Sequence, residues 1–295
     1  MRNPSARYRF VAPMIAAGVL LGGCGQSPIQ STAAPAPSVN AGQDVRGKTV
    51  RVPAGAPGEP VAAGLGAKSQ FVTGPDPETL PEGSLYRNPA NGRDEAIVAD
   101  IRHTAVLIGD SQSEPLTAWT RQGLGNAGYG VFFCGLGGTG FVAANGKTGN
   151  YIDALQRGDW KLPYGSPPLV VIQGGGNDAT RGATDAQIVA NAERLIATLR
   201  QRYPGSKLLM IGTLARGANY GGGRRTQVDA LLGTIAAKQE IPFVSVGDWL
   251  SRYNLTRLLA DGTHMSAEGN DALGVLLGQR LEEMGIQADD TATVR

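Results

Sequence analysis

Five short, mainly apolar runs recur between residues 104 and 246, and segments with helical spacing separate them. The runs cover residues 104–108, 130–133, 169–173, 208–211 and 243–246. Strands that are apolar on both faces are typical of a parallel sheet covered by helices on both sides. The alternation of strands and helices therefore predicts an α/β fold, a three-layer α/β/α sandwich around a five-stranded parallel sheet.

Three helices are predicted between and after these strands. The first begins at the N-cap residue Thr184 and ends before Pro204, and its apolar positions return at helical spacing. These positions are Ile188, Ala192, Leu195, Ile196 and Leu199. A second apolar face covers 228–235, and a third helix follows the cap residue Ser266 and presents leucines at 273, 276, 277 and 281.

The N-terminus has the pattern of a targeting segment. Three arginines precede an apolar stretch at residues 10–21, which is shorter than the roughly 20 apolar residues that span a bilayer. Leu21-Gly22-Gly23-Cys24 then resembles the lipobox of bacterial lipoproteins. We expect residues 1–23 to be a lipoprotein signal peptide and Cys24 to be lipidated, which would anchor the chain in the membrane. The alternative is an ordinary signal peptide that contains a cysteine.

The remaining chain divides by composition. Residues 24–68 are rich in Pro, Ala and Gly, which is typical of a linker. We expect a partly ordered lead-in at 69–100, one folded domain at 101–287 and a disordered tail at 288–295. The expected location is the cell envelope, outside the cytoplasm.

Charge and cysteine content exclude some classes of function. The formal net charge is +2 and no long basic run occurs, so no nucleic-acid partner is expected. Cys24 and Cys134 are the only cysteines. Because Cys134 lies in an apolar strand, we interpret it as a buried small residue and not as a nucleophile.

The residues with chemical potential all follow predicted strands. Ser111 follows the first strand, Gly138 the second and Asn177 the third, and Asp261 and His264 lie between the fifth strand and the last helix. Ligands of open parallel sheets bind beyond the carboxyl ends of the strands. A serine, a histidine and an acid at one such edge have the chemistry of a nucleophilic hydrolase.

Four blocks resemble the SGNH (GDSL-type) hydrolase family over roughly residues 103–284. They are Gly109-Asp110-Ser111, the glycine-rich stretch 135–139, Gly176-Asn177-Asp178 and Asp261-x-x-His264. Gln112 stands where the family usually has leucine, and we expect no chemical consequence. The resemblance implies a flavodoxin-like sheet of the SGNH hydrolase type, a small acyl-ester substrate and no cofactor.

The site residues carry distinct roles under this interpretation. Ser111 is the nucleophile, His264 its general base, and Asp261 orients the imidazole. Asp-Gly is also a common turn pair, so Asp261 can have a turn role as well. The backbone N–H groups of Ser111 and Gly138 and the amide of Asn177 form the oxyanion hole, with Gly137 as the alternative to Gly138.

The other titratable residues receive structural interpretations. We expect His103 to be structural and to lack an acid at the spacing that joins Asp261 to His264. Asp110 and Asp178 are interpreted as braces that accept backbone N–H groups. No metal site is expected, because no further histidine or cysteine is available to complete one.

Two segments are expected to wall the site. Residues 139–166 hold Tyr151, Trp160 and Tyr164, which either stack on sugar rings or pack internally. Residues 215–225 hold Arg216, Tyr220 and Arg224, and these are the candidate substrate-binding residues. The alternative for the arginines is solvated loop charge.

These observations predict a serine esterase that acts through a Ser-His-Asp triad and an acyl-enzyme. Its expected substrates are glycan, glycolipid or extracellular lipid esters of the envelope. Two alternatives stay open: an O-acyltransferase that uses the same residues, and a non-catalytic envelope binding protein.

Overall fold

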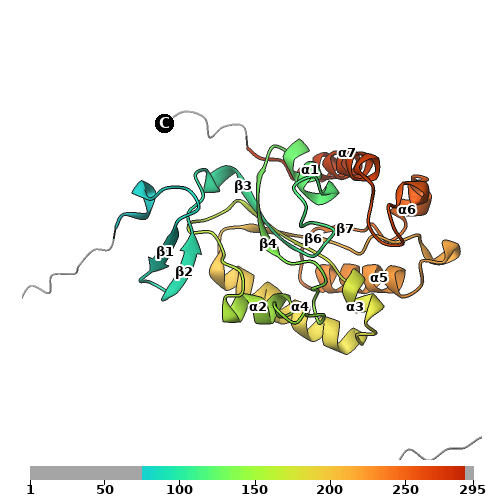
Figure 1. Ribbon diagram of the computed structural model, residues 1–295, viewed down its shortest axis with the longest axis horizontal. Helices are drawn as coiled ribbons and strands as arrows, with labels where there is room; N and C mark the ends of the chain where they lie inside the picture. Colours follow the sequence, from blue (N-terminus) through green and yellow to red (C-terminus); the bar gives the residue numbers. More distant parts are fainter. Residues whose placement is uncertain (1–74, 290–295) are drawn as a thin grey trace, which may run out of the picture. The chain divides into compact units, whose positions relative to one another are not determined.

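The computed structural model of this protein describes residues 75–289 (Figure 1). The predicted signal peptide at 1–23, Cys24 and the linker at 24–68 lie outside the described residues, as do the first six residues of the lead-in and residues 290–295. Within 75–289, no helix combines the length and apolarity that a membrane crossing requires.

The core is a five-stranded parallel sheet, as predicted. Its strands lie side by side in the order β4 (Gly130–Gly135), β3 (Thr104–Gly109), β5 (Leu169–Gln173), β6 (Lys207–Ile211) and β7 (Phe243–Val244). Numbered along the chain, this order is 2-1-3-4-5, the flavodoxin-like arrangement. From β3 the chain continues to β4 on one side of it and then to β5 on the other side. The loops that follow these three strands therefore meet at the carboxyl end of the sheet.

The last strand is shorter than predicted. The apolar run extends to Val246, but β7 ends at Val244. Asp229 explains the early end, because its carboxylate accepts the Ser245 hydroxyl at 2.6 Å and the Val246 N–H at 3.2 Å. The backbone at this point bonds to a side chain of the preceding helix and not to β6.

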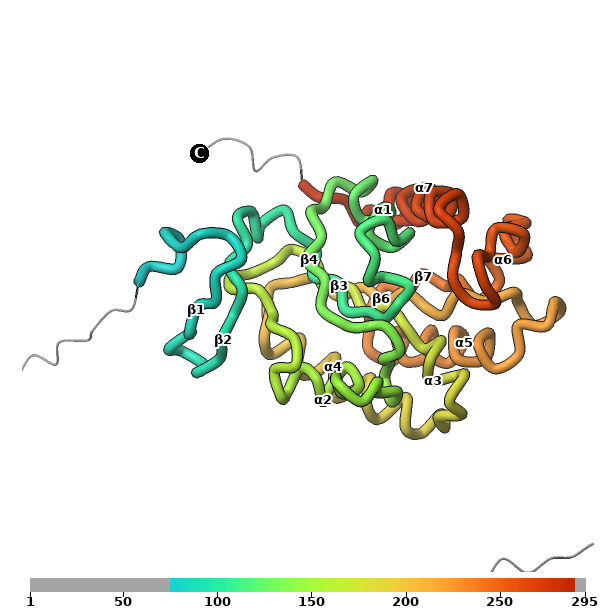
Figure 2. Tube along the Cα trace, viewed as in Figure 1, coloured from blue at the N-terminus to red at the C-terminus, as the bar shows by residue number. Residues whose placement is uncertain are grey.

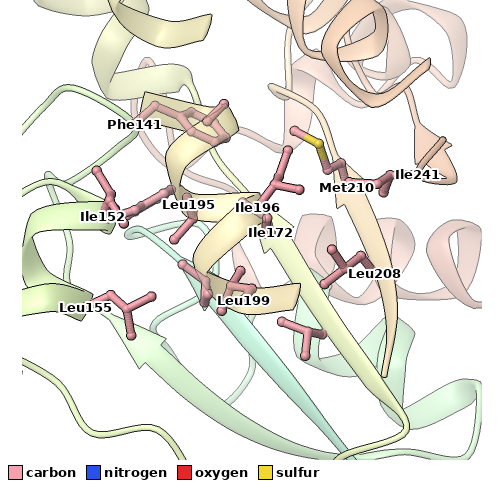
Figure 3. Packing of buried hydrophobic residues seen from close by; sticks show 14 of the residues in the cluster. Phe141, Ile152, Leu155, Ile172, Leu195, Ile196, Leu199, Leu208, Met210 and Ile241 are labelled. Atoms are coloured by element: carbon pink, nitrogen blue, oxygen red, sulfur yellow. The ribbon is translucent and has the colours of Figure 1, made fainter. Parts of the chain in front are cut away.

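Alternate residues of each strand pack into two separate cores, one on each face of the sheet. Val106, Ile108 and Ile172 face α2 (Tyr151–Arg157), α4 (Asp185–Arg202) and α5 (Gly223–Lys238), and Figure 3 shows part of this packing. Leu107, Val171 and Leu209 face α1 (Trp119–Asn126), α6 (Trp249–Arg252) and α7 (Ala267–Glu283). Helices therefore cover both faces, which confirms the three-layer sandwich (Figure 1).

The predicted helix signals operate as expected. Thr184 caps α4 in a capping box with Gln187, and Ser266 accepts the Gly269 N–H at the start of α7. All five predicted apolar residues of α4 are fully buried. In α5 and α7, Leu231 and Leu276 are only partly buried, and the other predicted residues face the core.

Helix α1 is not predicted, and it packs closely on α7 through glycines. A Cβ on Gly123 would come within 2.5 Å of Leu277, and a Cβ on Gly274 within 2.7 Å of Gln122. Figure 2 shows the two helices side by side. Glycines that lower helix propensity in isolation are required here, because they allow two helices to approach each other.

The described part of the lead-in forms an antiparallel hairpin of β1 (Leu85–Asn88) and β2 (Arg93–Ala96). The Ala96 N–H donates to the Leu162 carbonyl at 3.0 Å, and Tyr86 packs edge-on against Tyr164 with ring centroids 5.0 Å apart. The hairpin is thereby joined to the segment that leads into β5.

Candidate active site

Three side chains from two distant segments meet at the carboxyl edge of the sheet. Ser111 follows β3, and Asp261 and His264 lie in the loop before α7. His264 Nε2 is 2.9 Å from Ser111 Oγ, and His264 Nδ1 is 2.8 Å from Asp261 Oδ2. Both distances are within hydrogen-bond reach, which is the arrangement that activates a serine hydroxyl through a base oriented by an acid.

Asp261 orients the histidine and also shapes its loop. Asp261 Oδ1 accepts the Thr263 N–H at 2.6 Å and the His264 N–H at 2.7 Å. The His264 backbone bond, followed by the His264 side-chain bond, lowers the pKa of Asp261 to about 2. The carboxylate is therefore ionised at neutral pH, and the turn role and the orienting role that the sequence suggests coexist.

Gln112 joins the two loops that carry Ser111 and His264. Its amide Nε2 donates to the Thr263 carbonyl at 2.9 Å, and its Oε1 accepts the Trp119 indole N–H at 3.3 Å. The side chain is buried. A leucine at this position would pack here but could not make either bond, so Gln112 contributes structurally to the register between the two loops.

The two candidate glycines of the oxyanion hole, Gly138 and Gly137, differ in whether their backbone N–H group already has an acceptor. The Gly137 N–H donates to Glu114 Oε2 at 2.8 Å. Within residues 75–289, the N–H groups of Ser111 and Gly138 have no acceptor. Gly138 adopts φ +79°, a conformation that favours glycine. Backbone donors without a protein acceptor are the kind of group that can bind an oxyanion.

Asn177 lies in α3 (Gly176–Thr180), the short helix that follows β5. Its amide nitrogen donates to the Thr139 carbonyl at 2.9 Å and to Asp110 Oδ2 at 3.2 Å. Both amide hydrogens therefore have protein acceptors. The contact with Asp110 is the longer of the two.

Asp110 combines deep burial with few hydrogen bonds. It is 2% exposed, and its Oδ1 accepts the Gln112 N–H at 2.9 Å. Burial raises the pKa of Asp110 to about 6, while the Gln112 bond and the charge of Arg225 oppose the rise. Burial in turn lowers the pKa of Arg225, whose Nε donates to the Leu214 carbonyl at 3.2 Å. Sequence reasoning did not connect Arg225 with Asp110, because β5 and β6 separate them.

Asp178 is a brace, in agreement with its interpretation. Its carboxylate accepts the N–H groups of Phe141, Val142 and Ala143 at 2.7–2.9 Å. These bonds hold the loop after β4 against α3. The loop that carries Gly138 and the helix that carries Asn177 are thus fixed to each other.

A small pocket of about 320 Å³ opens beside the serine and histidine. Its lining is Ser111, Gln112, Glu114, Pro115, Ala118, His264, Met265 and Asn270. None of the three candidate substrate-binding residues belongs to this lining. Arg216 and Tyr220 are exposed after β6, and Arg224 pairs with Asp185 and donates to the Ala183 carbonyl. The structure does not bring these three side chains to the serine.

The aromatic residues expected to wall the site lie elsewhere. Tyr151 is buried in the core, and its hydroxyl donates to the Gln173 carbonyl at 2.9 Å. Tyr164 contacts Tyr86 of the hairpin, and Trp160 lines a different pocket, next to β2 and α2. The packing alternative holds for all three, since Trp160 is partly buried and packs against the same core as Tyr151. Cys134 is also buried as expected, and burial raises the pKa of its thiol.

The expectation that His103 lacks an acid is wrong. Asp100 precedes it by three residues, the spacing of Asp261 and His264, and His103 Nδ1 is 2.8 Å from Asp100 Oδ2. This pair lies at the opposite end of β3 from Ser111. Among the described residues, no group of three or more His, Cys, Asp or Glu side chains is arranged to hold a metal ion.

Residues 98–272 match the GDSL-like lipase/acylhydrolase family. No curated protein matches the chain. Among solved structures, a lipase/acylhydrolase from Enterococcus faecalis is 21% identical, with 62% of this chain and 96% of that chain covered and a TM-score of 0.47. A catalytic mutant of an acetylxylan esterase from Geobacillus stearothermophilus is 16% identical, with coverage of 64% and 97% and a TM-score of 0.49.

A family two carbohydrate esterase from Clostridium thermocellum, solved as an active-site mutant, is 15% identical with a TM-score of 0.47. The aligned part covers 62% of this chain and only 64% of that esterase. The chain therefore spans less than two thirds of that relative's length.

Proposed function

Because this chain belongs to the GDSL-like lipase/acylhydrolase family, we propose that it hydrolyses carboxylic esters through an acyl-enzyme on Ser111. Ester hydrolysis is the activity class that the family match gives. The Ser-His-Asp mechanism and the substrate are our proposal.

The proposed first step is attack of Ser111 Oγ on the ester carbonyl carbon. His264 Nε2, 2.9 Å from that oxygen, takes the hydroxyl proton as the new bond forms. When the tetrahedral intermediate collapses, the same proton goes to the oxygen of the leaving alcohol. Water then attacks the acyl-enzyme, gives its proton to His264, and the acid leaves as Ser111 Oγ takes that proton back.

The developing oxyanion is proposed to bind the N–H groups of Ser111 and Gly138 and the Asn177 amide. The two N–H groups lack acceptors within residues 75–289, and one of them belongs to the nucleophile itself. Asp261 stays ionised throughout, since its pKa of about 2 is far below neutral pH, and it stabilises the imidazolium of each step.

One observation carries this proposal: an unbroken chain of contacts from Asp261 through His264 to Ser111, at 2.8 and 2.9 Å, formed by segments about 150 residues apart in sequence. A structural histidine has no need of a serine partner in addition to its acid. The separation of 153 residues between Ser111 and His264 excludes a local turn as the explanation.

The pocket beside Ser111 supports a small acyl group. Pro115, Ala118 and Met265 give it apolar walls, and its volume of about 320 Å³ is at the low end for ligand sites. We propose short-chain esters of envelope glycans, glycolipids or extracellular lipids as substrates. Anchoring at Cys24 in the cell envelope is likewise proposed, on the basis of the pattern of residues 1–24.

Fluorophosphonate labelling tests the proposal. The purified chain without residues 1–24 should be labelled on Ser111, as mapped by mass spectrometry, and should cleave 4-nitrophenyl acetate faster than longer-chain esters. Ser111→Ala removes the reactive oxygen and should abolish both signals while its circular dichroism stays unchanged. A folded wild-type protein that is neither labelled nor active would contradict the proposal and favour the non-catalytic envelope binding protein.

Product analysis separates hydrolysis from acyl transfer. With a sugar acceptor added, a hydrolase should still release free acid as its main product. An O-acyltransferase using the same residues would transfer most of the acyl group to the sugar hydroxyl.

A further inference from the structure

Arg181 places a guanidinium beside the proposed oxyanion hole. It caps α3, where its backbone N–H donates to the Asn177 carbonyl at 2.9 Å. Its side chain extends to the loop after β4, and Nη1 donates to the Ala144 carbonyl. Nη2 lies 3.6 Å from the position that a Cβ on Gly138 would occupy. One short helix therefore delivers both the Asn177 amide and this guanidinium to Gly138.

The space next to Gly138 is otherwise open. Apart from the residues adjacent in sequence, only Asn145 Cβ, at 3.5 Å, shares that 4 Å neighbourhood with Arg181. Asn145 is held in place by its amide, which donates to the Gly137 carbonyl at 3.0 Å. A substrate group beside the Cβ position of Gly138 would therefore lie within reach of the Arg181 guanidinium.

The charge of Arg181 is not neutralised within the described part of the chain. It is exposed and has no carboxylate within 4.0 Å there. The two nearby acids are engaged with backbone: Asp178 accepts three N–H groups, and Glu114 accepts the Gly137 N–H. Lys147, in the same loop as Gly138, is exposed and equally without an acid partner in residues 75–289. Two basic side chains on this side of the site, Arg181 and Lys147, thus have no carboxylate partner within residues 75–289.

We infer that Arg181 binds a carboxylate of the substrate close to the scissile ester, so that the enzyme acts on anionic esters. This inference rests on the proposed function and specifies its substrate class. A guanidinium matches a carboxylate with two parallel hydrogen bonds from two of its nitrogens. Within residues 75–289, Arg181 Nη1 is used by the Ala144 carbonyl, while Nε and Nη2 have no acceptor and can make both bonds. A neutral ester makes no use of this contact.

Two matched ester pairs test the inference and show which half of the ester carries the charge. On the acyl side, mono-4-nitrophenyl glutarate is compared with 4-nitrophenyl pentanoate, after subtraction of the rate without enzyme. On the alcohol side, 3-acetoxybenzoate is compared with its methyl ester. Each pair is assayed with wild type, Arg181→Gln, Arg181→Lys and the control Arg102→Gln, an exposed arginine at the other end of β3.

Arg181→Gln should lower kcat/KM about 10- to 100-fold for the anionic member of at least one pair, mainly through KM, since a charge-assisted hydrogen bond is lost. For the neutral member of each pair, kcat/KM of Arg181→Gln should stay within about twofold of the wild-type value. Arg181→Lys keeps the charge but not the paired geometry and should recover part of the loss. Arg102→Gln should change nothing.

Four outcomes contradict the inference, and they can be told apart. Equal losses on anionic and neutral esters would assign Arg181 to the oxyanion or to loop structure. Unchanged rates on all esters, or a wild type that cleaves only the neutral esters, would remove the anionic substrate class and leave the esterase intact. A folded wild type that cleaves no ester would overturn the proposed function itself.

Discussion

Strand β3 has an Asp-x-x-His pair at each of its ends. Asp100 and His103 precede the strand, and Asp261 and His264 come over its carboxyl end from a distant loop. The spacing is the same, and both Nδ1-to-carboxylate distances are 2.8 Å. Only His264 continues to a serine, 2.9 Å away. The local pattern creates the dyad in both places, and something else must decide which dyad becomes a site.

The deciding difference is what converges on each end. At the carboxyl end, loops from β3, β4 and β5 bring Ser111, Gly138 and Asn177 to the same edge as His264. At the amino end, a cavity of about 720 Å³ includes Asp100, but no serine, threonine or cysteine lines it. In a parallel sheet the loops that follow the strands gather at one end, so the same pair of residues has different surroundings at the two ends of β3.

Removing each histidine in turn gives the largest expected contrast. His264→Ala should lower kcat by about 10⁴-fold or more, because the serine loses its base. His103→Ala should leave kcat and KM within about twofold of wild type. Steady-state hydrolysis of 4-nitrophenyl acetate measures both. Comparable losses in the two folded variants would mean that position along β3 does not separate the dyads.

The sequence predicts the dyad at the carboxyl end of β3 and misses the one at its amino end. Ser111 is recognisable in a short block at the end of an apolar run. Asp261 and His264 are recognisable in a block between the last predicted strand and the last predicted helix, which parallel topology places at the same end of the sheet. Asp100 was overlooked because its pair with His103 belongs to no block. Arg181 was overlooked for another reason: its proximity to Gly138 depends on how α3 packs on the loop after β4, which no local pattern encodes.

Substitution of Asn177 tests whether the loops gathered at the carboxyl end of β3 contribute to catalysis in addition to the Asp261–His264 pair. Asn177→Ala should lower kcat by about 10²–10³-fold with little change in KM, because it removes one oxyanion donor. The matched control is Asn191→Ala, since the Asn191 amide donates to the Phe141 carbonyl of the same loop at 2.8 Å. That variant should stay near wild type. Equal losses in both would show that the asparagines only brace the loop.

The helices also differ in whether local sequence or distant contacts determine them. Helix α4 is predictable from its own residues, because Thr184 caps it and five apolar side chains recur at helical spacing. Helix α1 is not, because Gly123 lowers its propensity and is needed only where α1 meets Leu277 of α7. The hairpin β1–β2 was missed because its residues are mostly polar and it is stabilised by contacts with residues 162–164.

The aspartates at the two ends of β3, Asp110 and Asp100, should also differ in how they affect the free energy of unfolding. Comparing the stability of Asp110→Asn with that of Asp100→Asn measures this smaller effect. The folded pKa of Asp110 is about 6, above the 3.8 of the unfolded chain, because burial disfavours the charge. The folded state therefore holds more protons than the unfolded state between these values, and the free energy of unfolding falls as pH rises through that window. A shift of about two pKa units corresponds to about 3 kcal/mol, most of which develops between about pH 4 and about pH 7.

Asp110→Asn removes that charge, so the variant should become more stable relative to wild type by about 2 kcal/mol on going from about pH 4 to about pH 7. The free energy of unfolding is measured in urea for wild type and variant at both pH values. Any pH-independent loss of the Gln112 or Asn177 bond cancels in the difference between the two pH values. Asp100→Asn, whose side chain is 62% exposed, should change stability by less than about 1 kcal/mol at either pH. If Asp110→Asn shifted stability equally at both, Asp110 would be ionised and satisfied in the folded state. Burial of Asp110 at the carboxyl end of β3 would then cost no more stability than Asp100 costs at the amino end.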